Sequence, residues 1–175
     1  AGKSLTVLQL LPALESGGVE RGTLELGAGL VHAGHRSLVI SAGGRLVSRL
    51  TGQGSEHFQW PIGRKSLWSL RLVKRLQKFI VNNRVDILHA RSRMPAWIAW
   101  LAWRGLPQQT RPRLVTTVHG LYSVSRYSSI MVRGEAVIAV SEAAQHYIFE
   151  HYPHTEASRV HLIERGIDRN IYPFA

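Results

Sequence analysis

Cysteine is absent from this 175-residue sequence, which excludes a disulfide framework and a thiolate metal site. No run of the chain approaches the ~20 uncharged apolar residues that a membrane-spanning helix requires. The GxGxxG dinucleotide fingerprint and the GxxxxGK[ST] phosphate loop are both missing, and no DxD-type acidic pair is present to hold a metal ion. The lack of thiols fits a reducing compartment, so we expect a cytoplasmic protein.

Acidic residues are also scarce. The chain has 11 Asp and Glu against 22 Lys and Arg, for a formal net charge of +11. Such an excess indicates an anionic partner, namely nucleic acid, a membrane surface or a phosphorylated substrate. A basic surface without a specific partner is the alternative. Because 45% of the residues are hydrophobic, we expect one globular domain with a sizeable core.

Short apolar runs alternate with amphipathic segments along the whole chain. The runs predict strands and the amphipathic segments predict helices. This alternation is typical of an α/β fold, a Rossmann-like parallel sheet with helices on both faces. We expect strands over 4–11, 36–41, 57–62, 85–90, 113–120, 135–141 and 159–168, the last including a turn, and helices over 19–34, 44–54, 66–83, 94–105 and 142–152.

Two adjacent glycines, Gly17 and Gly18, lie between the first predicted strand and the first predicted helix. In parallel sheets, ligands collect beyond the carboxyl ends of the strands. Glycine lets a ligand approach the backbone closely, and the N–H groups of a helix start attract anions. The pair therefore predicts a phosphate site, with a simple tight turn as the alternative.

Other strand ends carry basic and polar side chains. Arg91 and Arg93 follow the strand that contains His89, and paired arginines suit a phosphate or carboxylate unless they are solvated surface residues. His119 ends the next strand and suits hydrogen bonding or proton transfer, with a structural role as the alternative. Ser141 is placed to cap the helix over 142–152.

Five segments, taken in order, carry a resemblance to a known family: "LPALESGGVERGTLELGAGLVHAGH", "VDILHARSRMPAW", "VTTVHGLY", "VIAVSE" and "VHLIERGID". Together they resemble the N-terminal half of retaining glycosyltransferases of the GT-B type, the "group 1" or family 4 type that uses nucleotide-sugar donors. The segments "HARSRMPAW" and "TTVHGLY" are most similar to bacterial members that build lipopolysaccharide or other envelope glycans.

The resemblance implies a two-domain enzyme with its active site between the domains. Residues 1–168 would form the N-terminal, acceptor-side domain and 169–175 the start of a linker to a donor-binding domain, so this chain alone would be inactive. The implied substrates are a nucleotide-sugar and a glycan or lipid-linked acceptor, with retention of configuration. The resemblance implies no cofactor and no metal.

The resemblance also assigns residues. Gly17 and Gly18 would lie near the donor's phosphates, and His119 would be the catalytic residue at the reacting sugar. Arg165 stands where the family usually has Asn, so the Asn role does not carry over. The residues expected to bind acceptor or substrate are Arg21, His89, Arg91, Ser92, Arg93, Gly120, Tyr122 and Ser141.

The family's Glu-x7-Glu element belongs to its second domain. Glu142 and Glu150 have the same spacing, but they fall in a predicted helix of the first domain. We interpret this match as coincidence.

The helix predicted over 66–83 is both amphipathic and basic. Its expected apolar stripe consists of Leu67, Leu70, Val73, Leu76 and Ile80, with basic residues elsewhere on its surface. We expect the stripe to pack in the core. The basic face, with Trp68, could contact anionic lipid on the inner face of the plasma membrane. An ordinary solvated face is the alternative.

Two other classes of protein compete with the enzyme hypothesis. A nucleic-acid-binding module would explain the charge, but the basic residues are scattered and no helix-turn-helix, zinc finger or RNP pattern occurs. We therefore expect no nucleic-acid partner. A noncatalytic α/β ligand-binding domain remains the second alternative.

Overall fold

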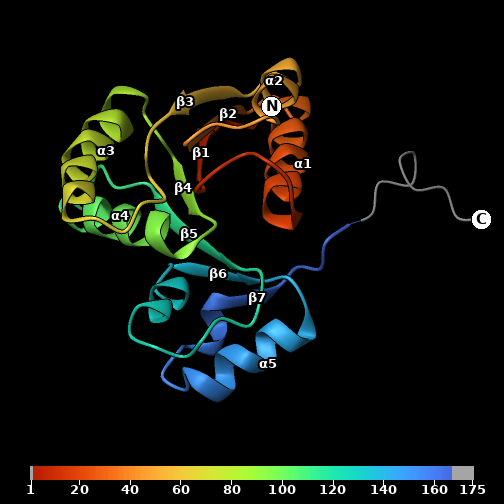
Figure 1. The fold of residues 1–175 in the computed structure, drawn as a ribbon, viewed down its shortest axis with the longest axis vertical. Helices are drawn as coiled ribbons and strands as arrows, with labels where there is room; N and C mark the ends of the chain where they lie inside the picture. Colours follow the sequence, from red (N-terminus) through yellow and green to blue (C-terminus); the bar gives the residue numbers. More distant parts are fainter. Residues whose placement is uncertain (1, 167–175) are drawn as a thin grey trace, which may run out of the picture.

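The computed structural model describes residues 2–166, which form a seven-stranded, entirely parallel sheet. The strand order is β3-β2-β1-β4-β5-β6-β7, so the chain builds one half outward from β1 and then crosses back to build the other (Figure 1). The carboxyl ends of all strands therefore share one edge. The predicted α/β, Rossmann-like fold class is confirmed. The strands are β1 (Thr6–Leu10), β2 (Arg36–Ser41), β3 (Glu56–Gln59), β4 (Ile87–Ala90), β5 (Arg113–Val118), β6 (Ala136–Ala139) and β7 (Val160–Leu162).

The connections between strands are mostly helical. The α-helices are α1 (Gly18–His32), α2 (Val47–Gly52), α3 (Leu70–Asn82), α4 (Arg93–Arg104) and α5 (Glu142–His151), and the 3-10 helices are η1 (Leu67–Ser69), η2 (Ser128–Val132) and η3 (Ala157–Arg159). These bounds match the predicted elements closely, although most strands are shorter than expected. Residues 167 and 168, predicted to end the last turn, and the predicted linker over 169–175 lie outside the described residues.

The helices lie in two layers on opposite faces of the sheet (Figure 1). Helices α1 and α2 cover one face around a small apolar cluster that includes Leu24, Val39 and Leu50. Helices α3, α4 and α5 share the larger cluster on the other face, where Leu8, Leu88 and their neighbours are buried. Strand side chains alternate between faces, so every second residue of β1 and β4 points away from the large cluster and toward α1.

Helix α3 and the turn before it bury only part of the apolar stripe that the sequence predicts. The buried residues of α3 are Leu72, Leu76 and Ile80, whereas Leu67 is 86% exposed and Leu70 is 57% exposed. The expected stripe is thus wrong at its first two positions. Leu67 belongs to the separate 3-10 helix η1, whose tighter winding breaks the 3.6-residue periodicity that the stripe assumed. Leu70 is the first residue of α3 and lies about 120° around the helix from the buried Leu76, so it faces away from the core.

The corrected face of α3 gives a direct test. Leu76→Ala should lower the free energy of unfolding by about 2–5 kcal/mol, because Leu76 is fully buried and its truncation leaves a cavity. Leu67→Ala, on the exposed η1, should change it by less than about 0.5 kcal/mol. Urea unfolding of both variants measures the difference. Equal losses would contradict this packing.

Candidate functional site

The carboxyl edge of the sheet gathers several of the predicted residues around the start of α1. Gly17 is the N-cap of α1 with a φ of 134°, a backbone conformation that favours glycine. No side chain caps this helix start. Helix α1 therefore presents free backbone N–H groups and its positive dipole end at this edge.

Arg91 is the central side chain of the site. Its backbone N–H donates to the carbonyl of Leu10, which extends the β4 ladder by one residue and aims the side chain at the α1 face. Only 6% of Arg91 is exposed. Its Nη1 donates to Oε1 of Gln9 at 3.3 Å, and Gln9 in turn donates to the carbonyl of Thr23 on α1. Its Nε has no hydrogen-bond partner in the described part of the chain.

A second guanidinium, that of Arg165, lies over the same helix. Arg165 donates from Nη2 to the carbonyl of Gly18. A Cβ atom on Gly18 would lie 2.6 Å from Nη1 of Arg165, and one on Gly22 would lie 2.8 Å from Nη2 of Arg91 and 3.3 Å from Nη2 of Arg165. Two glycines one turn apart thus make room for two cations on the surface of α1.

No carboxylate of the described residues forms an ion pair with either of these two cations. Burial, together with the charge of Arg165, lowers the pKa of Arg91 to about 10, and Glu25 only partly opposes that shift. A buried, uncompensated guanidinium is costly, and most of its donors point at no acceptor. The arrangement therefore suits an anion such as phosphate or carboxylate.

His119 lies beside this pair of cations. Burial lowers its pKa to about 3, and the charges of Arg91 and Arg165 act in the same direction. Its Nε2 is buried and has no hydrogen-bond partner among the described residues. The ring is therefore neutral near pH 7 and keeps a free nitrogen for a ligand. We call Gly18, Gly22, Arg91, His119 and Arg165 the Arg91 cluster.

His89 belongs to the layer beneath the Arg91 cluster. It is 4% exposed, and its Nε2 lies 2.5 Å from Oγ1 of Thr117. Burial, with the charge of Arg91, holds its pKa well below the usual range. Its position makes it a neutral, buried support for Arg91 and His119.

The structure separates the two arginines that the sequence pairs. Arg93 already belongs to α4 and points to the other side, where its Nη1 donates to Oγ of Ser128 at 3.2 Å. Its guanidinium lies 5.1 Å from the ring centroids of both Tyr122 and Tyr127. Arg93 and Tyr122 thus form a cation–π group on the side away from Arg91, and the Tyr122 hydroxyl adjoins the backbone of His119.

The remaining predicted residues have plainer surroundings. Arg21 is exposed on the first turn of α1, and Ser92 is the N-cap of α4 without a side-chain capping bond. Ser141 caps α5, as predicted, by accepting from the N–H of Ala144 at 3.1 Å. A Cβ on Gly120 would meet no atom within 4 Å, so the backbone after His119 is open to a ligand.

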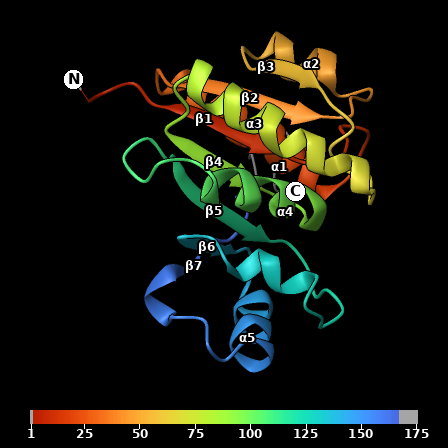
Figure 2. The same cartoon turned by 90° about the vertical axis from the view of Figure 1, so that its left-hand side faces the viewer.

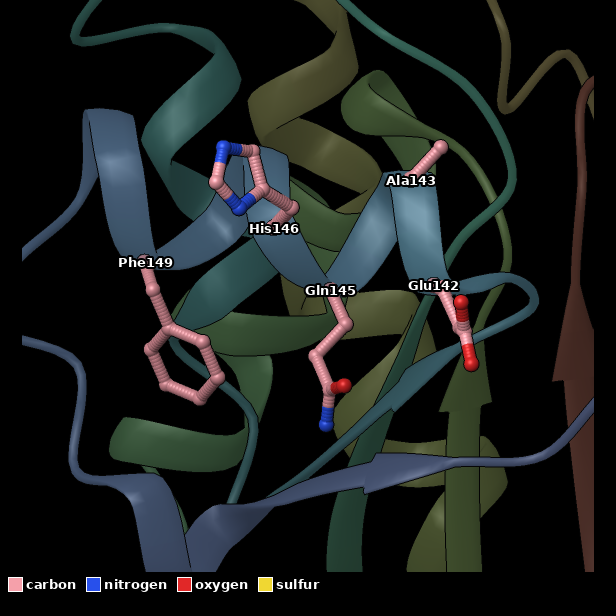
Figure 3. A pocket seen from close by; sticks show the side chains of 5 residues that line it. All are labelled: Glu142, Ala143, Gln145, His146 and Phe149. Carbon is pink, nitrogen blue, oxygen red and sulfur yellow. The ribbon is translucent and has the colours of Figure 1, made fainter.

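Among the described residues, surface grooves lie at the carboxyl edge and along α5. The first is lined by Pro12, Ala42, Gln59, Trp60, Pro61, Gly63 and Arg64. The other follows the outer side of α5 and is lined by Glu142, Ala143, Gln145, His146 and Phe149 (Figure 3).

Glu150 lies on the same helix and pairs with His146 and His151 at 3.6 and 3.9 Å, in accord with a chance Glu-x7-Glu spacing.

The described residues form no group of three or more His, Cys, Asp or Glu side chains that could hold a metal ion. None of their helices is both long enough and apolar enough to cross a bilayer. The sequence predicts Gly17, Gly18, Arg91 and His119 as site residues but assigns no role to Gly22 or Arg165. The role of Gly22 is visible in the sequence only as its spacing of one helical turn from Gly18, which places the two glycines on the same face of α1.

Comparison with known proteins identifies relatives of this architecture. A family model described as Glycosyltransferase Family 4 matches residues 16–170. A glycosyltransferase from Rickettsia africae ESF-5 is 35% identical with a TM-score of 0.84, over 98% of this chain and 46% of that one. No curated protein matches the sequence significantly.

More distant structures share the fold. HepE from Anabaena, solved in complex with UDP and glucose, is 20% identical with a TM-score of 0.76, over 96% of this chain and 46% of that one. Sucrose-phosphate synthase from Thermosynechococcus elongatus is 14% identical with a TM-score of 0.72, over 96% of this chain and 50% of that one. The chain thus spans about half the length of these proteins.

The uncompensated charge of Arg91 predicts an unusual mutational response. Arg91→Met should raise the free energy of unfolding by about 1 kcal/mol, because it replaces an unpaired buried cation by an apolar side chain of similar length. Arg93→Met is the matched control and should lower it by about 1 kcal/mol, since Arg93 loses Ser128 and two aromatic partners. Urea unfolding in phosphate-free buffer measures both. A loss of several kcal/mol in Arg91→Met would show that Arg91 is a structural residue.

The neutral histidines predict acid sensitivity. The pKa of His119 falls from about 6.5 in the unfolded chain to about 3 in the fold, so below pH 6.5 the unfolded chain binds a proton that the folded chain does not. The free energy of unfolding should fall by up to about 1.4 kcal/mol per pH unit between pH 6 and pH 4 for this ring. Urea titrations of the unmodified chain and His119→Gln should differ in slope by that amount. Parallel slopes would refute the burial of a neutral ring.

Proposed function

Because this chain belongs to glycosyltransferase family 4, we propose that it forms the acceptor-side half of an enzyme that transfers a sugar from a nucleotide-sugar donor. The observation that carries this proposal is the Arg91 cluster, two uncompensated guanidiniums and a neutral histidine at the uncapped start of α1. Such a site supplies positive charge where a nucleotide-sugar or a phosphorylated acceptor is negative.

The leaving group of a nucleotide-sugar is a diphosphate whose negative charge grows as the glycosidic bond breaks. Backbone N–H groups at Gly17 and Gly18, with the dipole of α1, would hold part of that charge. Arg165, fixed on the carbonyl of Gly18, adds a cation within the same turn. These groups stabilise the leaving group without a metal ion.

His119 would position the transferred sugar. A ring with a pKa of about 3 is uncharged at neutral pH, so it can hydrogen-bond a sugar hydroxyl but is a poor proton donor. The open space at Gly120 lets a sugar approach the backbone next to His119. The role is therefore one of orientation, in which the reacting carbon is held against the acceptor.

Arg91 would bind an anionic group of the acceptor, a phosphate or a carboxylate. We propose that the acceptor is an envelope glycan or a lipid-linked sugar, that configuration is retained, and that the enzyme works in the cytoplasm without metal or nucleic acid. The family match and the resemblance of the "HARSRMPAW" and "TTVHGLY" segments support this proposal.

The role of His119 can be measured in the complete enzyme. His119→Ala should lower kcat by about 10²–10³-fold, because one preorganised hydrogen bond at the reacting sugar is lost. His146→Ala, which removes an exposed histidine from the α5 groove, should leave kcat unchanged (Figure 3). Circular dichroism confirms that both variants fold.

Near-normal turnover of His119→Ala would remove this residue from the active site. Absence of turnover by the unmodified enzyme across a panel of nucleotide-sugars and lipid-linked acceptors would overturn the proposed function itself.

A further inference from the structure

Exposed apolar side chains gather on two segments of the carboxyl edge. Leu67, Trp68 and Leu70 are 86%, 66% and 57% exposed at the start of the α3 region, and Leu121 and Val124 are 68% and 53% exposed in the loop after β5. Single exposed apolar residues are ordinary on protein surfaces, but a group of large ones marks a contact surface.

The two segments lie next to each other in the fold. The Nζ atom of Lys65 lies 4.1 Å from the centroid of the Tyr127 ring, which joins the segment before η1 to the loop after β5. Both segments follow the carboxyl ends of strands, on the side to which the strand arrows point (Figure 2). We call residues 64–71 and 121–126 together the apolar lip.

The apolar lip itself contains basic residues and no acidic residue. Between Glu56 and Glu135 the sole acidic residue is Asp86. Asp86 precedes β4, where it accepts from the N–H of Thr6, so it lies at the opposite, amino edge of the sheet. The basic residues within the apolar lip and along the adjoining α3 are Arg64, Lys65, Arg71, Lys74, Arg75, Lys78 and Arg126.

Trp68 has the surroundings of a side chain at a membrane interface. The guanidinium of Arg71 lies 4.1 Å from its ring centroid, and both groups are at the surface. An indole that is half apolar and half polar, beside an arginine, suits the boundary between lipid headgroups and acyl chains. Leucines on either side would enter the acyl region while the arginines and lysines meet lipid phosphates.

We propose that the apolar lip docks on a bilayer of anionic phospholipid. This partner fits because insertion needs exposed large apolar side chains and phosphate headgroups need basic residues, and the two are interleaved here without an acidic residue. Docking in this way brings the groove that ends at Arg64 to the lipid surface. A lipid-linked acceptor could then reach the carboxyl edge without leaving the bilayer, a consequence that rests on the proposed function, whereas the docking does not.

Vesicle co-sedimentation of this chain tests the proposal. Binding should be at least about tenfold tighter to vesicles of phosphatidylglycerol and phosphatidylcholine than to phosphatidylcholine alone, since several basic residues face the headgroups. Leu67→Ser with Trp68→Ser, and separately Leu121→Ser with Val124→Ser, should each weaken binding by about tenfold or more, because apolar area is lost while charge is unchanged. The result would stand whether or not the enzyme transfers sugar.

Val81→Ser is the matched control. Val81 is 55% exposed on the same helix but near the far end of α3, so its loss should leave vesicle binding unchanged. Thermal unfolding checks that the variants fold, which is expected because every substituted side chain is exposed. Equal binding by the control and both double variants would overturn the proposal. So would indifference to lipid charge, or sedimentation equilibrium showing that the apolar lip joins two copies of this chain instead.

Discussion

The organising constraint of this domain is one buried guanidinium without a carboxylate partner. Arg91 follows β4, and the parallel register that sets Gln9 beside His89 brings Gln9 and the α1 surface within its reach. Removing an arginine from water without an opposite charge is unfavourable, so the surrounding groups are arranged to make it tolerable. Gln9 accepts one hydrogen bond, the two nearest histidines stay neutral, and Gly22 leaves space where a side chain would collide.

The same arrangement links the stability of the fold to the chemistry of its edge. A site preorganised for an anion keeps its donors in place before the anion arrives, and that is what makes it effective in stabilising developing charge. The stability is supplied elsewhere, by the large apolar cluster of α3, α4 and α5 on the opposite face. One face of the sheet thus carries the larger apolar cluster, whereas the other combines the smaller apolar cluster under α1 and α2 with the buried polar residues Gln9, His89, Arg91 and Thr117.

Much of this could be predicted from the sequence. Alternating apolar runs and amphipathic segments are enough to predict a parallel sheet, and the rule that ligands collect beyond the carboxyl ends then selects Gly17, Gly18, Arg91 and His119. The predicted stripe of α3 is correct at Val73, Leu76 and Ile80 but not at its start, where Leu67 lies in a separate 3-10 turn and Leu70 faces away from the core. The same rule selects the "ERGID" turn that contains Arg165, but the contact of Arg165 with Gly18, 147 residues away in the chain, could not be predicted.

The parallel sheet, its helices and the edge where ligands collect are thus predictable, because strand and helix periodicity are local properties that neighbouring residues impose on one another. Which basic side chains share a site depends instead on contacts made in the folded domain. Arg91 extends a strand, where side chains alternate between faces, and so points at α1, whereas Arg93 begins a helix and points at Tyr122 and Tyr127. Although Arg91 and Arg93 are two residues apart in the chain, their side chains point in opposite directions. Their directions depend on where β4 ends and α4 begins.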